Sequence, residues 1–273
     1  MTIAKSILIT SLFIIIWMGI GILIPVWNNA IMITPKIVFY ELMNDLVTYS
    51  IFTIYFWFSI DRFSLGEHEI KIQKLTFIFV IITLAIGIRL FDLPFWEWKQ
   101  LSNKYLNTAF IINNFSALKL SSFQFYLGLS GLILAPFFEE IIFRYYIFGG
   151  LLKKYSFLTA LLTSSILFSL IHIDSPRNLI PTFVLGLVSA IVYFRTQKIQ
   201  YSILLHFMHN LLWFTTLVFA SGYHQLIIKL GVGILFWISF LVGILLVILG
   251  LKTTTTTNNQ FGKIRAKPAA LRR

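Results

Sequence analysis

The stretch that decides the fold is SILITSLFIIIWMGIGILIPVW, residues 6–27, an apolar run of 22 residues without a charged side chain. About 20 apolar residues in a helix cross the hydrocarbon core of a bilayer. The run is longer than the apolar core of a signal peptide, and no cleavage pattern of small residues follows it. We therefore expect it to remain in the protein as a membrane helix.

The composition of the whole chain agrees with a membrane protein. The 273 residues are 58% hydrophobic and 12% charged, and the mean hydropathy is +0.85. Soluble domains carry about 25% charged residues, so this chain has too few polar side chains to cover a water-soluble globule. Cysteine is absent, which excludes disulfides, thiolate metal sites and a cysteine nucleophile.

Further apolar runs predict an all-α fold, a polytopic membrane protein with a bundle of about eight transmembrane helices. Helices satisfy their own backbone hydrogen bonds in hydrocarbon, and the sequence has no period-2 alternation typical of a membrane barrel. We expect the helices near residues 6–27, 38–60, 75–93, 121–151, 157–173, 178–196, 199–221 and 226–251.

The chain divides into three parts on this reading. Residues 1–120 hold about three transmembrane helices and an interfacial connection, which begins near the aromatic and charged stretch FDLPFWEWK at 91–99. Such mixtures are typical of the headgroup level. Residues 121–251 form a core of about five helices. Residues 252–273, with five threonines and several basic residues, are expected to be a disordered cytoplasmic tail.

The basic residues predict the orientation in the cell membrane. With eight helices, one side of the membrane carries both termini and 14 Lys and Arg residues, whereas the opposite side carries six. Short loops rich in Lys and Arg stay in the cytoplasm, so both termini are expected there. The net charge of +12 is spread over loops and tail without a nucleic-acid-binding module, and we expect a lipid bilayer rather than nucleic acid as its partner.

Function is sought among the polar residues within the apolar runs, because an ionisable group at membrane depth is costly unless it is paired or hydrated. The run PFFEEIIFR at 136–144 holds two adjacent carboxylates, which point about 100° apart on a helix. Arg144 lies four residues after Glu140 and can form a salt bridge with it. Glu139 is left without a local partner and is suited to take a proton from water. A buried ion network or an ion pathway is the alternative reading.

Two later motifs add three polar residues. His172 ends the run FSLIH, and His206 and Asn210 belong to HFMHN. His206 and Asn210 are four residues apart, so both project to one side of a helix and can donate to an oxyanion. His172 can orient a water molecule or move its proton. His209 is interpreted as a bystander.

Straight helices would hold these groups at different depths. Counted from the basic loops, Glu139, His172 and His206 lie about 21, 27 and 12 Å along helices that rise 1.5 Å per residue. Tilted helices, or a break at Gly149 and Gly150, would be needed to bring them level.

Taken together, the motifs resemble the CPBP family, also called Abi, of intramembrane proteases related to the CAAX prenyl endopeptidase. The family pattern of EExxxR, FxxxH and HxxxN is met by residues 139–144, 168–172 and 206–210. Phe183 and Gly186 match a further family feature, although Ala190 stands where a second Gly often occurs. The resemblance covers roughly residues 120–215.

The resemblance implies hydrolysis of a peptide bond in a membrane-associated protein or peptide precursor, with a link to bacteriocin maturation or self-immunity. Glu139 and His172 would activate water, and His206 and Asn210 would stabilise the oxyanion. No cofactor is favoured, because the zinc helix motif HExxH is absent. If Arg144 engages Glu140, three ligands remain, namely Glu139, His172 and His206, and three ligands still suffice for a catalytic zinc, so that version stays open.

Two other functions are compatible with parts of the sequence. Gly128-Leu129-Ser130-Gly131 spells the GxSG of rhomboid serine proteases, but Ser130 lies about 13 Å from Glu139 along a helix, and small residues also serve helix contacts. A non-catalytic immunity or scaffold protein, or a transporter, is the alternative from a different class.

Overall fold

The computed structural model describes residues 1–23, 35–59, 74–96, 98–106, 128–173, 175–218 and 233–255, and these residues form helices joined by turns. The elements in chain order are α1 (Ile3–Leu23), α2 (Pro35–Ser59), α3 (Lys74–Phe91), α4 (Leu93–Trp96), α5 (Trp98–Leu106), η1 (Ser130–Leu134), α7 (Ala135–Glu140), η2 (Ile141–Phe148), α8 (Gly149–Leu152), α9 (Phe157–Leu170), η3 (Pro176–Asn178), α10 (Leu179–Thr196), α11 (Ile199–Val218) and α13 (Ile234–Thr255). The all-α polytopic fold class is confirmed, and each of the eight predicted ranges contains a helix.

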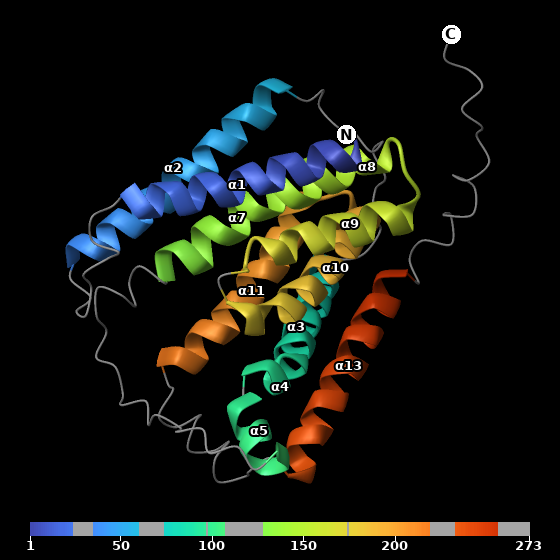
Figure 1. Ribbon diagram of the computed structural model, residues 1–273. Helices are drawn as coiled ribbons and strands as arrows, with labels where there is room; N and C mark the ends of the chain where they lie inside the picture. The colour runs from blue at the N-terminus through green and yellow to red at the C-terminus, as the bar shows by residue number, and fades with distance from the viewer. Residues whose placement is uncertain are drawn as a thin grey trace.

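Within the described ranges, four helices are long and apolar enough to cross a membrane by themselves. They span Ile3–Gly21, Thr76–Phe95, Pro176–Thr196 and Ile234–Thr254. Polar residues on faces turned into the protein occur on the other long helices, which are α2, α11 and the helix that runs from η1 to α8. Figure 1 shows α1 running across the view while α3 and α13 are steeply inclined to it, so the helices are mutually tilted.

Helix α13 lies along α3, and glycines permit their close approach (Figure 1). A Cβ atom added at Gly243 would lie 2.7 Å from the backbone nitrogen of Phe91 and 2.8 Å from the carbonyl oxygen of Gly87. Small residues at such crossings let two helix backbones meet, which is a common way to associate helices in lipid. The contact between α3 and α13 is thus made by backbone packing.

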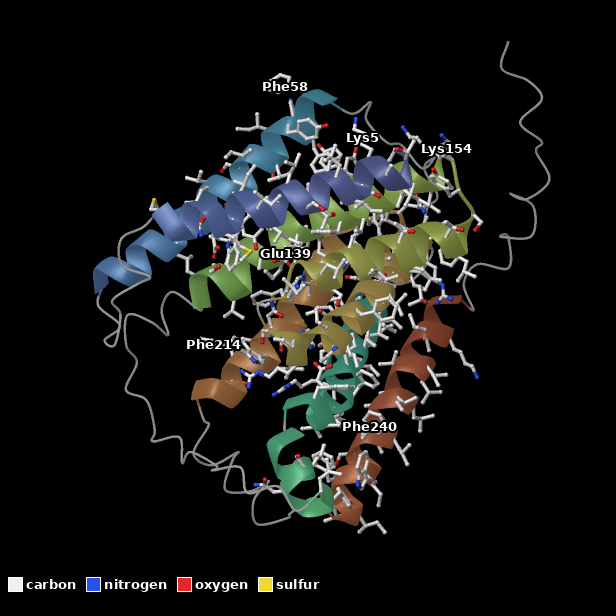
Figure 2. All side chains as sticks on the ribbon, in the orientation of Figure 1. Lys5, Phe58, Glu139, Lys154, Phe214 and Phe240 are labelled. Carbon is white, nitrogen blue, oxygen red and sulfur yellow. The ribbon has the colours of Figure 1, made fainter. Side chains whose placement is uncertain are left out.

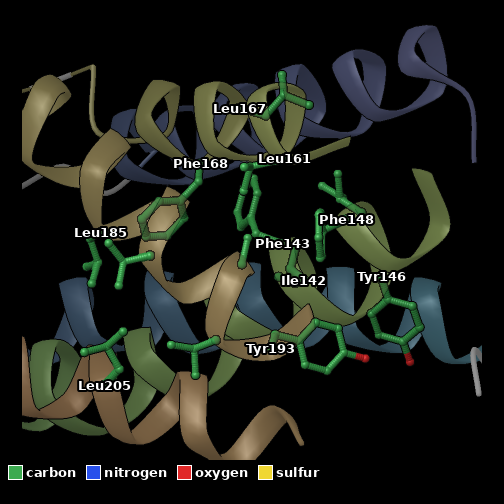
Figure 3. Packing of buried hydrophobic residues seen from close by; sticks show 14 of the residues in the cluster. Ile142, Phe143, Tyr146, Phe148, Leu161, Leu167, Phe168, Leu185, Tyr193 and Leu205 are labelled. Atoms are coloured by element: carbon green, nitrogen blue, oxygen red, sulfur yellow. The ribbon is translucent and has the colours of Figure 1, made fainter. Parts of the chain in front are cut away.

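The centre of the bundle is built on the helix from η1 to α8. Its hydrogen-bonding pattern changes three times, because the π-helical segments η1 and η2 alternate with the α-helical segments α7 and α8. The helix continues through Gly149 and Gly150 as α8, so the break considered there does not occur. Around it lies an aromatic core: the rings of Phe143 and Phe168 are 5.4 Å apart, and Phe148 contacts Tyr193 (Figure 3).

Two predicted segments flank this bundle. The interfacial connection begins with α4 and α5, and its remainder from residue 107 lies outside the described residues. Helix α13 extends to Thr255, four residues into the predicted tail. Near this end Arg195 donates to the Leu251 carbonyl and to Thr254. The tail from residue 256 lies outside the described residues.

Candidate active site

Two adjacent carboxylates lie at the end of α7, at the point where the helix changes to π-helical hydrogen bonding. The side chains of Glu139 and Glu140 are both buried, with 4% and 0% of their surface exposed. Because neighbouring residues of a helix point in different directions, the two carboxylates meet different partners. π-Helical turns are frequent at functional sites. Figure 2 shows Glu139 in the middle of the bundle.

Glu140 has a complete set of partners. The Nε atom of Arg144 lies 3.1 Å from Oε2 of Glu140. The Arg144 guanidinium lies over the Phe168 ring, with Cζ 4.3 Å from the ring centroid. His206 places Nδ1 3.1 Å from Oε1, and the Ser189 hydroxyl donates to Oε2 at 3.0 Å. The expected pairing of Glu140 with Arg144 is confirmed. The contacts of His206 and Ser189 with the same carboxylate were not predicted.

Glu139 is held at one oxygen only. The Tyr49 hydroxyl on α2 donates to Oε1 at 2.7 Å, and the Tyr49 ring stacks on Phe138 at 5.3 Å between centroids. Oε2 is buried and accepts no hydrogen bond from the described part of the chain. The spacing of residues on one helix did not reveal the partner of Glu139 on α2. One carboxylate oxygen therefore remains available at the centre of the protein.

His172 lies in the turn that follows α9. Its Nδ1 is 3.1 Å from the Phe168 carbonyl oxygen. A carbonyl only accepts, so Nδ1 carries the hydrogen of this bond. The Phe168 ring lies 5.3 Å from the His172 ring and 5.8 Å from the His206 ring, which makes Phe168 the common neighbour of both histidines. The structure thus gathers His172, His206 and Arg144 around one aromatic side chain.

His206 and Asn210 lie one turn apart on α11, as predicted, but they contact different groups. His206 faces Glu140, whereas the Asn210 Nδ2 donates to the carbonyl oxygen of Gly131 at 2.7 Å. Direct contact of His206 with Glu140 shows that the tilted helices remove the difference in depth that straight helices would impose. The shared role of His206 and Asn210 at an oxyanion stays a prediction.

Sequence reasoning missed a second polar cluster next to Asn210. His209 Nε2 lies 2.7 Å from Asp92 Oδ2, and His209 Nδ1 lies 3.3 Å from Asn210 Oδ1. Asp92 is 1% exposed at the junction of α3 and α4. His209 thus links a buried aspartate to a predicted site residue, whereas its interpretation as a bystander in catalysis stays a prediction. The buried ionisable Asp92 after an apolar run was the available signal.

The GxSG serine has a contact of its own. The Ser130 hydroxyl donates to Asp45 Oδ2 at 2.5 Å, and the indole Nε1 of Trp17 donates to Oδ1 at 2.9 Å. Asp45 lies one helical turn before Tyr49 on the same helix, so one face of α2 contacts both η1 and α7. This arrangement agrees with a helix contact rather than a rhomboid nucleophile, because the serine faces a carboxylate where a rhomboid has histidine.

A zinc ion fits this arrangement poorly. Both oxygens of Glu140 are engaged by Arg144, His206 and Ser189, and Oε1 of Glu139 is engaged by Tyr49. Across the described ranges, no three His, Asp or Glu side chains are gathered so that they could hold a metal ion. We therefore assign no step to a metal.

Comparison with known proteins finds a family whose model matches part of this chain. The model of the family described as "Type II CAAX prenyl endopeptidase Rce1-like" matches residues 121–212, the segment that contains all six predicted site residues. "Putative membrane peptidase YdiL" of Bacillus subtilis is 42% identical over 78 residues, which are 29% of this chain and 32% of that protein. "UPF0177 protein YxdF" of Lactococcus lactis is 35% identical over 79 residues, which are 29% of this chain and 43% of that protein.

The matched segment spans about a third to two-fifths of the length of these curated relatives. No solved structure is significantly similar to the chain. The likeness consequently concerns the helices that carry the site: residues 121–212 are similar to the type II CAAX prenyl endopeptidases, which supports the resemblance to the CPBP family.

Proposed function

We propose that this chain is an intramembrane endopeptidase that hydrolyses a peptide bond of a membrane-associated protein or peptide precursor. The observation that carries the proposal is the contrast between two adjacent buried carboxylates. Glu140 is neutralised by Arg144 and held by further donors, whereas Glu139 keeps Oε2 without a hydrogen bond from any described residue. A buried carboxylate that is oriented but incompletely bonded is suited to general-base catalysis.

The chemistry follows from these positions. Oε2 of Glu139 takes a proton from a water molecule, whose oxygen attacks the carbonyl carbon of the scissile bond. Tyr49 holds Oε1 at 2.7 Å and so fixes the direction of Oε2. The proton then passes to the leaving amine as the carbon–nitrogen bond breaks, which restores the carboxylate. His172 orients the water from the turn after α9.

The oxyanion requires donors in the same region. Asn210 supplies an N–H group from its amide, and His206 supplies Nε2–H from a protonated imidazole whose Nδ1–H is bound by Glu140. Such preorganised donors contribute most when water is excluded. The contact between Glu140 and His206 fixes the orientation of the imidazole, so the ion pair of Glu140 and Arg144 supports the site without taking a proton itself. We infer a glutamate mechanism without a metal.

The setting of the reaction is also part of the proposal. We infer a multi-pass protein of the cell membrane with both termini in the cytoplasm, because the basic residues favour that orientation. Its partners are the bilayer and a membrane-associated substrate. Peptide or bacteriocin maturation and self-immunity are compatible roles.

The test compares cells that express the wild type, Glu139→Gln or a control variant, and identifies membrane peptides that accumulate or disappear. Glu139→Gln keeps the shape of the side chain and removes the base. Thr215→Ala is a matched control, because the Thr215 hydroxyl bonds only to the Leu212 carbonyl of its own helix among described contacts. We expect cleavage products with the wild type and the control, and none with Glu139→Gln at equal protein level.

The same variants separate the enzyme from a non-catalytic immunity or scaffold protein. If Glu139→Gln confers the same immunity and leaves the peptide pattern unchanged, the proposed mechanism is wrong. A purified wild-type protein in liposomes that cleaves the identified peptide, with the Glu139→Gln protein inactive, supports the enzyme directly.

A further inference from the structure

We propose that His209 and Asp92 are positioning residues that fix the side-chain amide of Asn210 for its role at the oxyanion, an inference that rests on the proposed function. Asp92 comes from the junction of α3 and α4, outside the segment matched by the family model. His209 and Asn210 are neighbours on α11. The three side chains form a continuous chain of contacts that ends at the backbone of η1.

The first step concerns the orientation of the Asn210 amide. Its Nδ2 faces the Gly131 carbonyl oxygen at 2.7 Å. A carbonyl oxygen only accepts, so the opposite orientation of the amide would bring two acceptors together at that distance. The Asn210 NH2 group therefore points to Gly131, and Oδ1 points to His209.

The second step counts protons between His209 and its neighbours. Oδ1 of Asn210 only accepts, so the contact with His209 Nδ1 at 3.3 Å requires a hydrogen on Nδ1. The contact between His209 Nε2 and Asp92 Oδ2 at 2.7 Å requires another hydrogen, carried by either atom. Asp92 and His209 thus hold two protons together, and the one on Nδ1 serves Asn210.

As a consequence, the side-chain amide of Asn210 is held at both its oxygen and its nitrogen. His209 holds Oδ1, and Gly131 takes one hydrogen of the NH2 group, which leaves the second hydrogen for an incoming oxyanion. Without His209, Gly131 would be the one described residue that still holds the amide. Asp92 is 1% exposed and His209 8% exposed, and a hydrogen-bonded pair in such surroundings is rigid because its members have few alternative partners.

A first experiment tests the proton count without reference to activity. Histidine labelled with ¹⁵N is incorporated into the full chain in detergent micelles, and His209→Asn identifies the His209 signals. We expect Nδ1 of His209 to be protonated in the wild type. An unprotonated Nδ1 would overturn the proposal whatever the protein does to peptides.

A second experiment measures kcat and KM with a fluorescence-quenched peptide that spans the cleavage site found in the cell comparison. His209→Leu removes the donor to Asn210, and we expect kcat to fall about 10- to 100-fold while KM changes by less than about twofold. His209→Asn should recover most of kcat, because its Nδ2 is as many bonds from the backbone as Nδ1 of histidine. Asp92→Leu/His209→Leu leaves no unpaired buried charge and should match His209→Leu.

The decisive comparison uses Asn210→Ala as the background. Since His209 acts through Asn210, His209→Leu should have no further effect on kcat once Asn210 is alanine. Losses that multiply in the double variant would overturn the positioning role. This outcome differs from failure of the proposed function, in which Glu139→Gln itself keeps full activity.

Discussion

The contact between α3 and α13 and the site around α7, η2 and α11 are two ways of joining helices in one protein. At the first, Gly87 and Gly243 bring the helix backbones together without a charged group. At the second, the carboxylates of Glu139 and Glu140, the Arg144 guanidinium and the His206 imidazole are buried, and the guanidinium lies over the Phe168 ring. Polar groups in such surroundings cost stability unless each is bonded. The proposed function explains why the second region retains them, whereas the first region needs only close packing.

The largest change is expected when the buried ion pair of the site is broken. Arg144→Met leaves Glu140 buried without its guanidinium, and loss of one partner of a buried pair costs about 3–5 kcal/mol. We expect the thermal unfolding temperature in detergent to fall strongly or the protein to be lost from the membrane. Arg144→Met/Glu140→Gln should recover part of the stability but not peptide cleavage. Unchanged stability of the single variant would contradict the assignment of this pair as a neutralising unit.

A smaller change is expected at the glycine crossing. The Cβ of Gly243→Ala would lie 2.8 Å from the Gly87 carbonyl oxygen, and overpacking of this kind costs about 1–3 kcal/mol. Unfolding should therefore occur at lower temperature, while cleavage per folded molecule stays near the wild-type value. Gly19→Ala is the matched control, because nothing described lies within 4 Å of its added Cβ. A selective loss of kcat in Gly243→Ala would remove the distinction between the two regions.

Tyr49→Phe should separate orientation of Glu139 from packing. The phenylalanine keeps the ring that stacks on Phe138 and loses the hydroxyl that donates to Glu139, so the stability change should be about 1 kcal/mol. We expect kcat to fall about tenfold because Oε2 is less well directed. Peptide cleavage assays and thermal unfolding on the same preparation measure both effects. Wild-type kcat would show that Tyr49 does not position the base.

The smallest effect is expected from removal of metal ions. The carboxylate oxygens of Glu140 are engaged by protein donors, so the mechanism proposed above needs no zinc. Cleavage by the purified protein should be unchanged after treatment with EDTA or 1,10-phenanthroline and dialysis. Loss of activity that is restored by added zinc would favour the zinc-dependent version.

The sequence predicted the parts of this site that depend on one helix. Glu140 and Arg144 are four residues apart, and so are His206 and Asn210; helix geometry alone places each pair on one side. It also predicted the helices, since hydrophobic runs of sufficient length have few alternatives in a bilayer.

Residue spacing within one helix did not predict the contacts between helices. Tyr49 and Glu139 are separated by 90 positions, and Asp92 and His209 by 117. Their pairing depends on the tilt and rotation of helices, which residue spacing within one helix does not determine. An ionisable residue in an apolar run, such as Asp45 or Asp92, was nevertheless a signal that a partner existed elsewhere.

The π-helical segment Ile141–Phe148 gives this helix a reserve of length that an α-helix lacks. Its i→i+5 hydrogen bonds enclose one residue more than the i→i+4 bonds of an α-helix. Deletion of a single residue between Glu140 and Gly149 can therefore be absorbed by a return to α-helical bonding, which keeps α7 and α8 in register and leaves both carboxylates facing Tyr49 and His206. The same deletion in an α-helix such as Phe157–Leu170 rotates one end by about 100° relative to the other. A reading-frame-preserving deletion of one codon in this segment should thus be less damaging than the same deletion in α9.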